Sequence, residues 1–90
     1  MSIVAVKIKI MPSSPEVSLS EIEVHIKEIL ERNGVKNPQF TIEPIAFGLK
    51  ALIVMFGWPE ERELDTLEAE LQRISDVSSV QIIDIRRAIG

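Results

Sequence analysis

The chain has 90 residues, no cysteine and a formal net charge of −4. This length suits one small domain over residues 1–90, and we find no linker, low-complexity segment or repeat. Direct nucleic-acid binding usually requires a basic face that neutralises phosphates, and this acidic composition argues against it. Without cysteine there is neither a disulfide frame nor a thiolate metal site, as expected of a cytoplasmic protein.

The first two predicted elements are a strand and a helix. Residues 3–11, IVAVKIKIM, alternate apolar side chains with two lysines, which predicts a strand and excludes a signal peptide or a membrane span. After a loop at 12–16, apolar residues recur at steps of three and four. Ser18 and Glu21 fit a capping box, and Asn33-Gly34 fits a helix end. The predicted helical stripe consists of Leu19, Ile22, Ile26, Ile29 and Leu30.

Two further strands are predicted in the middle of the chain. Residues 38–46 form the first, with Phe40 and Ile42 facing the core. Pro44 has no N–H to donate, so this strand lies at a sheet edge or ends there. The nearly continuous apolar run LKALIVMF, residues 49–56, is typical of a strand with neighbours on both sides. We expect Gly57-Trp58-Pro59 to break it.

A second helix and a last strand complete the chain. Asp65 and Glu68 are candidate caps for this helix, and Pro59 is a candidate for an earlier start. The acids Glu60, Glu61, Glu63 and Asp65 are best explained as a solvated helix start that complements the helix dipole. Residues 77–85 predict the last strand, which ends in Arg86-Arg87. The stripe that predicts the helix is Leu64, Leu67, Leu71 and Ile74.

The order β-α-β-β-α-β predicts the fold. Two βαβ halves joined by a hairpin give an α+β, ferredoxin-like sandwich, with two helices on one face of a four-stranded antiparallel sheet. Right-handed crossovers set the strand order 4-1-3-2 and make the first and third strands central. The loop at 12–17, the hairpin at 44–49 and the turn at 75–77 then fall at one end. The segment 57–60 and both termini fall at the other.

No catalytic chemistry is visible in the sequence. His25 is the single histidine and is interpreted as a helix-surface residue, while Ser13 and Ser14 have no partner base. The four glycines are scattered and form no phosphate-binding loop. The first strand has no aromatic residue on which an RNA base would stack. We therefore expect no enzyme activity, no cofactor and no metal site.

The two ends of the sandwich carry the remaining unexplained residues. Phe47 beside Gly48, with Lys50 next along, forms an apolar knob on a hairpin; the alternative is that the ring folds back over the helix layer. Arg86 and Arg87 close the last strand, where the alternative is a charged terminus that discourages aggregation.

Three segments, MPSSPEVSL, PIAFGLKAL and VSSVQIIDIRRAI, together resemble the archaeal translation elongation factor 1-beta family. The resemblance covers essentially the whole chain. The second segment is the most specific, because eukaryotic relatives have a similar Pro-x-Gly-aromatic-Gly-x-Lys-Lys-Leu pattern. Ala46 replaces the first glycine of that pattern and Ala51 the second lysine. The N-terminal extensions of the eukaryotic factors have no counterpart here.

The resemblance implies guanine-nucleotide exchange on the GTPase elongation factor 1-alpha. It implies that the aromatic matching Phe47 docks in the second domain of the GTPase, and that the C-terminal end reaches toward the nucleotide and its magnesium. There the eukaryotic family uses a lysine one residue before the C-terminus. Aligned on Asp84-Ile85, that position is Gly90, so the lysine is not carried over and Arg86 or Arg87 is our candidate cation.

The expected partner-binding residues are therefore Pro44, Phe47, Gly48, Lys50, Asp84, Arg86 and Arg87. A second hypothesis from another class is a ligand-sensing or subunit-interaction module that uses the open sheet face. Its apolar patch, with a weak homodimer as one use, would consist of Ile3, Ala5, Ala51, Ile53 and Met55.

Overall fold

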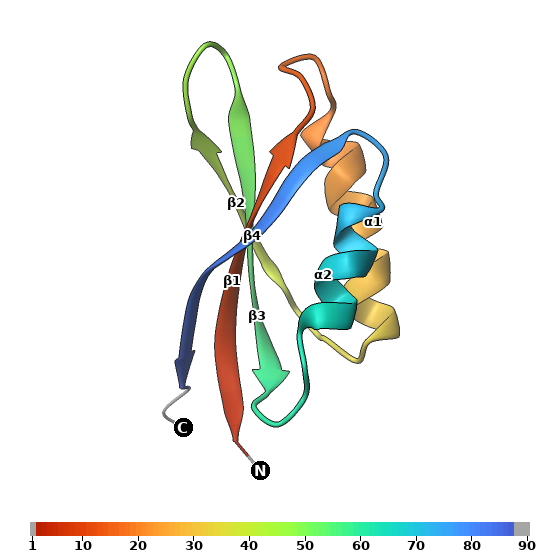
Figure 1. Cartoon of the computed structure of the whole chain (residues 1–90), viewed down its shortest axis with the longest axis vertical. Helices are drawn as coiled ribbons and strands as arrows, with labels where there is room; N and C mark the ends of the chain where they lie inside the picture. Colours follow the sequence, from red (N-terminus) through yellow and green to blue (C-terminus); the bar gives the residue numbers. More distant parts are fainter. Residues whose placement is uncertain (1, 88–90) are drawn as a thin grey trace.

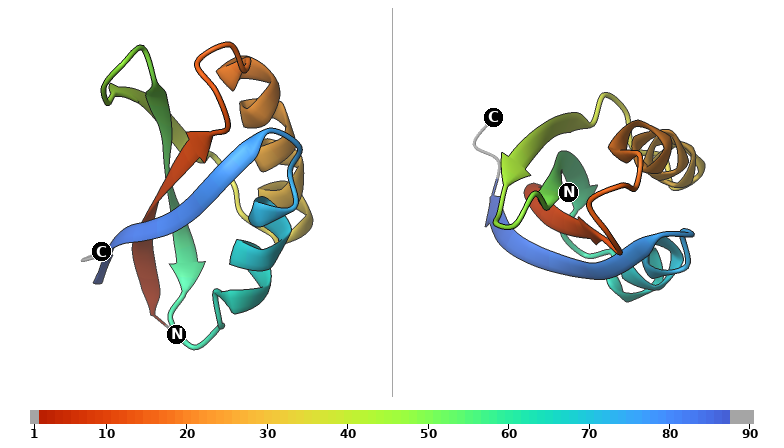
Figure 2. Two further views of the ribbon diagram at one scale, coloured as in Figure 1. Left: turned by 45° about the horizontal axis from the view of Figure 1, so that its top comes forward. Right: turned by 90° about the horizontal axis from the view of Figure 1, so that it is seen from above.

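The computed structural model describes residues 2–87, and its elements follow the predicted order. Four strands form one antiparallel sheet in the order β2-β3-β1-β4, and both helices cover one face of it (Figure 1). Figure 2 shows the two layers from above. This is the ferredoxin-like α+β sandwich that the sequence predicted. The elements are β1 (Ile3–Pro12), α1 (Leu19–Arg32), β2 (Gln39–Pro44), β3 (Lys50–Pro59), α2 (Asp65–Gln72) and β4 (Val77–Arg87).

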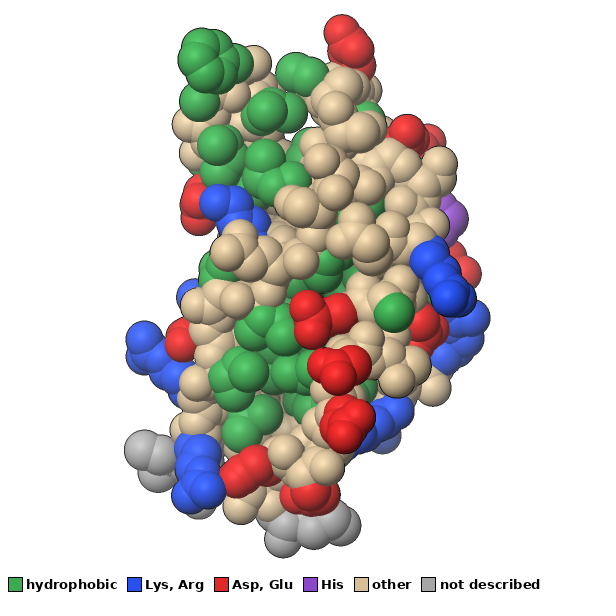
Figure 3. Space-filling view, viewed as in Figure 1, with side chains coloured by type: hydrophobic (Ala, Val, Ile, Leu, Met, Phe, Trp, Pro, Cys, Tyr) green, Lys and Arg blue, Asp and Glu red, His purple; other side chains and the backbone are tan. Residues whose placement is uncertain are grey.

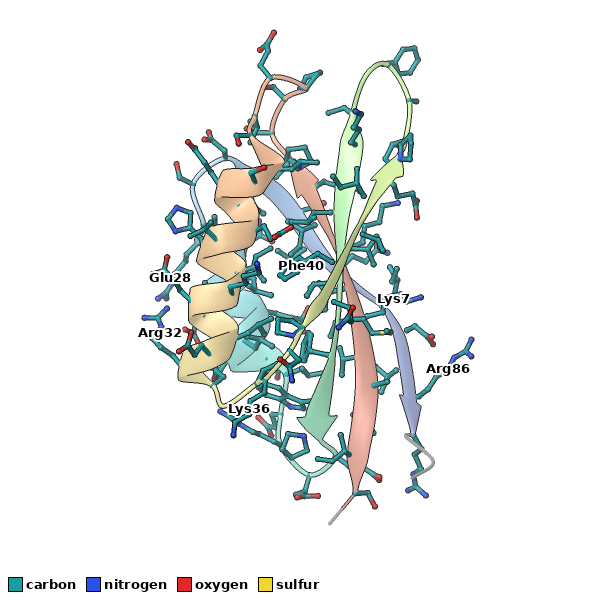
Figure 4. All side chains as sticks on the ribbon, turned by 180° about the vertical axis from the view of Figure 1, so that it is seen from behind. Lys7, Glu28, Arg32, Lys36, Phe40 and Arg86 are labelled. Carbon is teal, nitrogen blue, oxygen red and sulfur yellow. The ribbon has the colours of Figure 1, made fainter. Side chains whose placement is uncertain are left out.

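The core lies between the sheet and the helices. Alternate residues of β1 point into it, because successive strand side chains face opposite sides of the sheet. Phe40 of β2 lies between sheet and helix layer (Figure 4), partly buried, with the ammonium of Lys27 5.6 Å from its ring centre. Neither helix is long and apolar enough to cross a bilayer within the described residues. The fully buried core of β1 and α1 consists of Val6, Ile8, Ile10, Ile22, Ile26 and Leu30.

The two helices begin differently. Ser18 caps α1 as predicted: its hydroxyl oxygen accepts a hydrogen bond from the Glu21 N–H at 3.3 Å. The caps predicted for α2 were wrong, since this helix has no side-chain cap at its start. It begins at Asp65 and not at Pro59. The acids near this start, Asp65 and Glu68 among them, lie in or before its first turn, where they still complement the dipole.

The predicted break at 57–59 was also wrong. Strand β3 continues to Pro59, and Trp58 pairs with Val4 of β1. Trp58 is only 2% exposed; its indole N–H donates to the Arg62 carbonyl at 2.9 Å, and the Arg62 guanidinium lies 4.5 Å from the ring centre. A large buried side chain with its one donor satisfied stabilises the strand where Gly57 and Pro59 alone would end it.

Ile42 is the third correction. It lies on the core-facing side of β2, paired with buried Leu52, yet 57% of its surface is exposed. Strand β2 is an edge strand, as Pro44 predicted, and Ile42 faces the loop between β1 and α1 and only the first residue of α1, Leu19. The edge position therefore leaves an apolar side chain uncovered.

The predicted distribution of loops between the two ends is confirmed. The β2–β3 hairpin and the loop after β1 lie at one end, whereas the β3–α2 connection, the start of β1 and the end of β4 lie at the other (Figure 1). The molecule measures 42 × 22 × 20 Å, so these two ends lie far apart along its longest dimension.

Candidate functional site

The hairpin between β2 and β3 turns at Phe47 and Gly48. Both have positive φ angles, 54° and 79°, as a type I′ turn requires. The Leu49 N–H donates to the Ala46 carbonyl at 2.9 Å, and the Ile45 N–H donates to the Leu49 carbonyl at 2.9 Å. The backbone geometry of this tip is therefore well defined by hydrogen bonds.

Phe47 is a poor residue for this position on grounds of stability. A bulky side chain in the left-handed region is strained, by about 1–3 kcal/mol. Its ring is also 98% exposed, so it gains almost nothing from packing. The alternative that the ring folds back over the helix layer is thus wrong. Neither backbone preference nor packing in the free protein therefore accounts for an aromatic residue here.

Other apolar side chains surround this tip. Ile45 and Ile42 are 39% and 57% exposed, and Figure 3 shows hydrophobic side chains gathered at the hairpin end. Pro44 ends β2 and pairs with Lys50, which begins β3. The expected residues Pro44, Phe47, Gly48 and Lys50 therefore lie together on one end of the sandwich.

The opposite end carries the arginines, each beside a carboxylate. Arg86 pairs with Ala5 on the open face of the sheet, and its Nε lies 2.9 Å from Asp84 Oδ2. Arg87 pairs with Val4, on the helix-facing side, and its Nη2 lies 2.9 Å from Glu60 Oε2. The two guanidinium groups thus point to opposite faces, as alternation along a strand predicts.

The structure brings Asp84, Arg86 and Arg87 together but holds them a strand length from Phe47. Strand β3, with its ten residues, spans this separation, roughly 30 Å at about 3.3 Å per residue. Figure 4 shows Lys7 and Arg86 on the sheet face away from the helices. The Gly90 position lies outside the described residues. The residues of the predicted site therefore fall into two groups at opposite ends of the sheet.

The open sheet face is less apolar than predicted. Ala51 and Ile53 are buried, and an ion pair of 3.7 Å between Lys9 and Glu43 spans the strand that carries them. Ala5 is half-buried. Ile3 and Met55 keep substantial exposure, 46% and 40%. As a patch of five apolar residues this prediction was wrong.

The remaining chemistry-bearing residues form no centre. Among residues 2–87 no three His, Asp or Glu side chains gather closely enough to hold a metal ion. His25 is exposed on α1, with Nδ1 4.0 Å from the Glu28 carboxylate. His25 and Glu28 therefore lie on an ordinary exposed helix surface.

Comparison with known proteins identifies the family. Residues 5–88 match the EF-1 guanine nucleotide exchange domain. The chain belongs to this family. It is 41% identical to elongation factor 1-beta of Methanocaldococcus jannaschii, over 98% of this chain and 100% of that relative. It is 40% identical to elongation factor 1-beta of Methanosarcina barkeri, over 97% and 99% of the two chains. Its function is guanine nucleotide exchange in translation elongation.

Solved structures support the fold alone. The C-terminal domain of MgtC from Mycobacterium tuberculosis superposes with a TM-score of 0.62 at 17% identity, covering 98% of this exchange domain and 88% of that chain. The structure entitled BlrP1 BLUF gives 0.57 at 13% identity, covering 100% of this exchange domain and 57% of that chain.

Sequence reasoning missed two features of the exchange domain. Glu60 was assigned to a solvated helix start, and its contact with Arg87 depends on a tertiary approach that no local pattern reveals. A concavity between the hairpin and the loop after β1, lined by Ile42 and Gly48 among others, was missed as well, because the alternation of Phe40 and Ile42 indicated burial for both. The signal that could have indicated an exposed Ile42 was the position of its strand at the sheet edge, where the helices do not cover the end of the strand.

Replacing Phe47 by Asn should stabilise the free protein. Asn tolerates positive φ, and Asn-Gly is a preferred type I′ pair, so we expect the free energy of unfolding to rise by about 1 kcal/mol. Chemical denaturation measures it. Asn37 is exposed and has the same φ of 54°, so Asn37→Phe is the matched inverse and should lose a similar amount. A less stable Phe47→Asn variant would show that the ring supports folding.

Proposed function

We propose that this chain promotes GDP-to-GTP exchange on elongation factor 1-alpha and that its two ends divide the work. The hairpin end, with Phe47 at its tip, anchors the GTPase. The end of β4 acts near the nucleotide. The observation that carries this proposal is Phe47 itself, which is 98% exposed at a positive φ. Relatives of this chain carry the name elongation factor 1-beta, which supports the choice of target.

Anchoring by one aromatic residue is energetically sufficient. A buried aromatic hot spot contributes about 2–4 kcal/mol when measured by truncation to alanine. The turn holds Phe47 on a hydrogen-bonded hairpin, so little backbone freedom is lost on binding. Lys50, three residues on, adds a cation to the same surface.

Exchange itself needs no covalent step. A factor that prefers the nucleotide-free GTPase weakens nucleotide binding by the same factor, since coupling between two ligands is reciprocal. GDP then leaves faster, and GTP replaces it when more abundant. We therefore propose that the chain makes and breaks no covalent bond and works in the cytoplasm.

The arginine end is suited to disturb the metal that holds the nucleotide. Magnesium bridges nucleotide phosphates to carboxylates of its protein, and a cation placed nearby disfavours it electrostatically. Arg86 and Arg87 are each paired within the free chain, but their side chains are 80% and 78% exposed. Such surface pairs stabilise a protein by only about 0–1 kcal/mol. Either arginine therefore exchanges its carboxylate for one on the GTPase at small cost.

A sensing or subunit-interaction module is the less favoured alternative. Burial of Ala51 and Ile53 removes the centre of its apolar patch. A weak homodimer through Ile3 and Met55 remains a separate proposal, with a small surface to support it.

We expect small amounts of this protein to accelerate GDP release from its cognate elongation factor 1-alpha. Release of labelled GDP is followed with excess unlabelled nucleotide, with GTPase alone as the control. One molecule should act on many GTPase molecules, because the factor is released when new nucleotide binds. An unchanged release rate with folded protein in excess would contradict the proposed function.

Phe47→Ala should weaken binding to the nucleotide-free GTPase by about 30- to 1,000-fold, the equivalent of 2–4 kcal/mol. Its melting temperature should hardly change, because the ring contacts little in the free protein. Titration calorimetry gives the affinity. Val24, 55% exposed on α1, provides the matched control: Val24→Ala should bind normally. A large loss of thermal stability in Phe47→Ala would instead identify Phe47 as a folding residue.

The single variants Arg86→Ala and Arg87→Ala test whether the arginines affect the rate of nucleotide release more than the affinity for the GTPase. Because the two guanidinium groups face opposite sides, we expect one variant to lose about tenfold in exchange rate, near 1.4 kcal/mol of barrier, with much less loss of affinity. High magnesium should slow exchange by the wild type. Arg73→Ala, an exposed arginine after α2, is the control. If both variants exchange at the normal rate, the cation comes from Lys7, Lys9 or Lys50, or displacement is not electrostatic.

A further inference from the structure

A concavity of about 310 Å³ lies directly below the Phe47 knob, between the β2–β3 hairpin and the loop that leads from β1 into α1. Gly48 closes it on the hairpin side. Most of its lining side chains are apolar, but polar atoms make up more than half of the lining surface, and Lys50 contributes the one charged side chain. The other lining residues are Pro12, Pro15, Val17, Leu19 and Ile42.

The loop that forms one wall is held in place without a partner. The Ser13 N–H donates to the Asp76 carbonyl at 2.8 Å, which ties the loop to the α2–β4 turn. The Val17 N–H donates to the Ser14 carbonyl at 3.3 Å. A Cβ added at Gly48 would lie 3.9 Å from Pro15 Cβ, so any larger side chain at this position would narrow the space between loop and hairpin. The concavity is therefore largely formed in the free protein.

Ile42 shows that this concavity is open. Its side of β2 faces the core, and its pairing partner Leu52 is 1% exposed, whereas Ile42 itself is 57% exposed. Ile45 and Phe47 are further exposed apolar side chains of the same hairpin end, where Figure 3 shows hydrophobic side chains gathered. Exposed apolar side chains gathered in this way mark protein interfaces.

The positive charge of Lys50 indicates which kind of partner group would bind beside the pocket. Lys50 is exposed at the rim and has no ion pair within the described part of the chain. An ammonium at the edge of an apolar hollow favours a partner with a carboxylate next to an aliphatic group.

We propose that this pocket receives one aliphatic side chain of the GTPase that binds Phe47, with a neighbouring GTPase carboxylate on Lys50. The proposal rests on the proposed function. Phe47 then inserts into the GTPase, while an aliphatic side chain of the GTPase inserts into the adjacent pocket. Two such contacts fix the orientation of the partner, whereas one contact would leave it free to rotate. That orientation directs the arginine end, roughly 30 Å away, toward the nucleotide.

A second copy of this chain is a less suitable occupant. A two-fold pair through the hairpin ends would present the same surface on both sides, so it would bring two Lys50 ammonium groups into one interface and supply no carboxylate from this pocket. The like charges would oppose the contact, whereas a GTPase carboxylate would not.

The test compares three threonine variants in binding to the nucleotide-free GTPase. Ile42→Thr and Val17→Thr keep the β-branch but place a hydroxyl on the pocket wall, and each should lower affinity about tenfold. Val24→Thr is the matched control, since Val24 is 55% exposed and does not line the pocket, and it should bind within about twofold of wild type. Melting temperatures identify any variant that folds poorly.

A second measurement does not depend on these variants. In a deuterated chain with protonated methyl groups, saturation of the protonated GTPase should reach the methyls of Val17, Leu19 and Ile42 and spare Val24. Lys50→Gln should lower affinity at low salt and make binding less dependent on salt, because it removes one exposed charge.

The outcomes separate this proposal from the one on which it rests. Normal binding by Ile42→Thr and Val17→Thr, with no saturation at their sites in the wild type and weak binding by Phe47→Ala, overturns the pocket proposal alone. Failure of the wild type to bind the GTPase overturns both. Self-association of the wild type that Ile42→Thr abolishes assigns the pocket to a second copy and overturns the proposal.

Discussion

The rest of the structure depends on the pairing of β1 with strands on both of its edges. Strand β1 pairs with β3 from Ile3 to Ile10 and with β4 from Val4 to Pro12, so every residue of its central part is held on two sides. Its alternate apolar side chains form the floor of the core, and both helices pack on that floor. Because these central strands run the length of the molecule, their register fixes the distance between the hairpin and the end of β4.

A rigid separation of this kind suits a protein that must contact a partner at two places. The hairpin turn is closed by backbone hydrogen bonds, and the opposite end is held by burial of Trp58 and by Arg62, whose guanidinium donates to the Asn33 carbonyl at 2.7 Å. Neither end requires a large rearrangement before binding. The proposed anchoring at the hairpin and the proposed action at the end of β4 can thus be altered separately by mutation.

The exposed residues at the two ends differ in their effect on the stability of the fold. At the hairpin, Phe47 combines backbone strain with exposure, and the frame tolerates both because the core lies elsewhere. At the end of β4 each arginine is paired with a carboxylate, Arg86 with Asp84 and Arg87 with Glu60. These contacts lie on the surface, where ion pairs are weak and easily replaced.

The sequence by itself determined the elements, their order and the strand arrangement, because apolar periodicity and chain connectivity leave one compact solution. It also placed Phe47 on a turn and both arginines at a strand end. Only the tertiary structure decided the rest. Burial of Trp58 overrides the local tendency of its glycine and proline neighbours to end a strand, and an edge position leaves Ile42 uncovered. The partners of the arginines, and the hollow below Phe47, arise between segments far apart in the chain. Local patterns carry no information about such approaches, since they depend on how loops of particular length meet around a finished core.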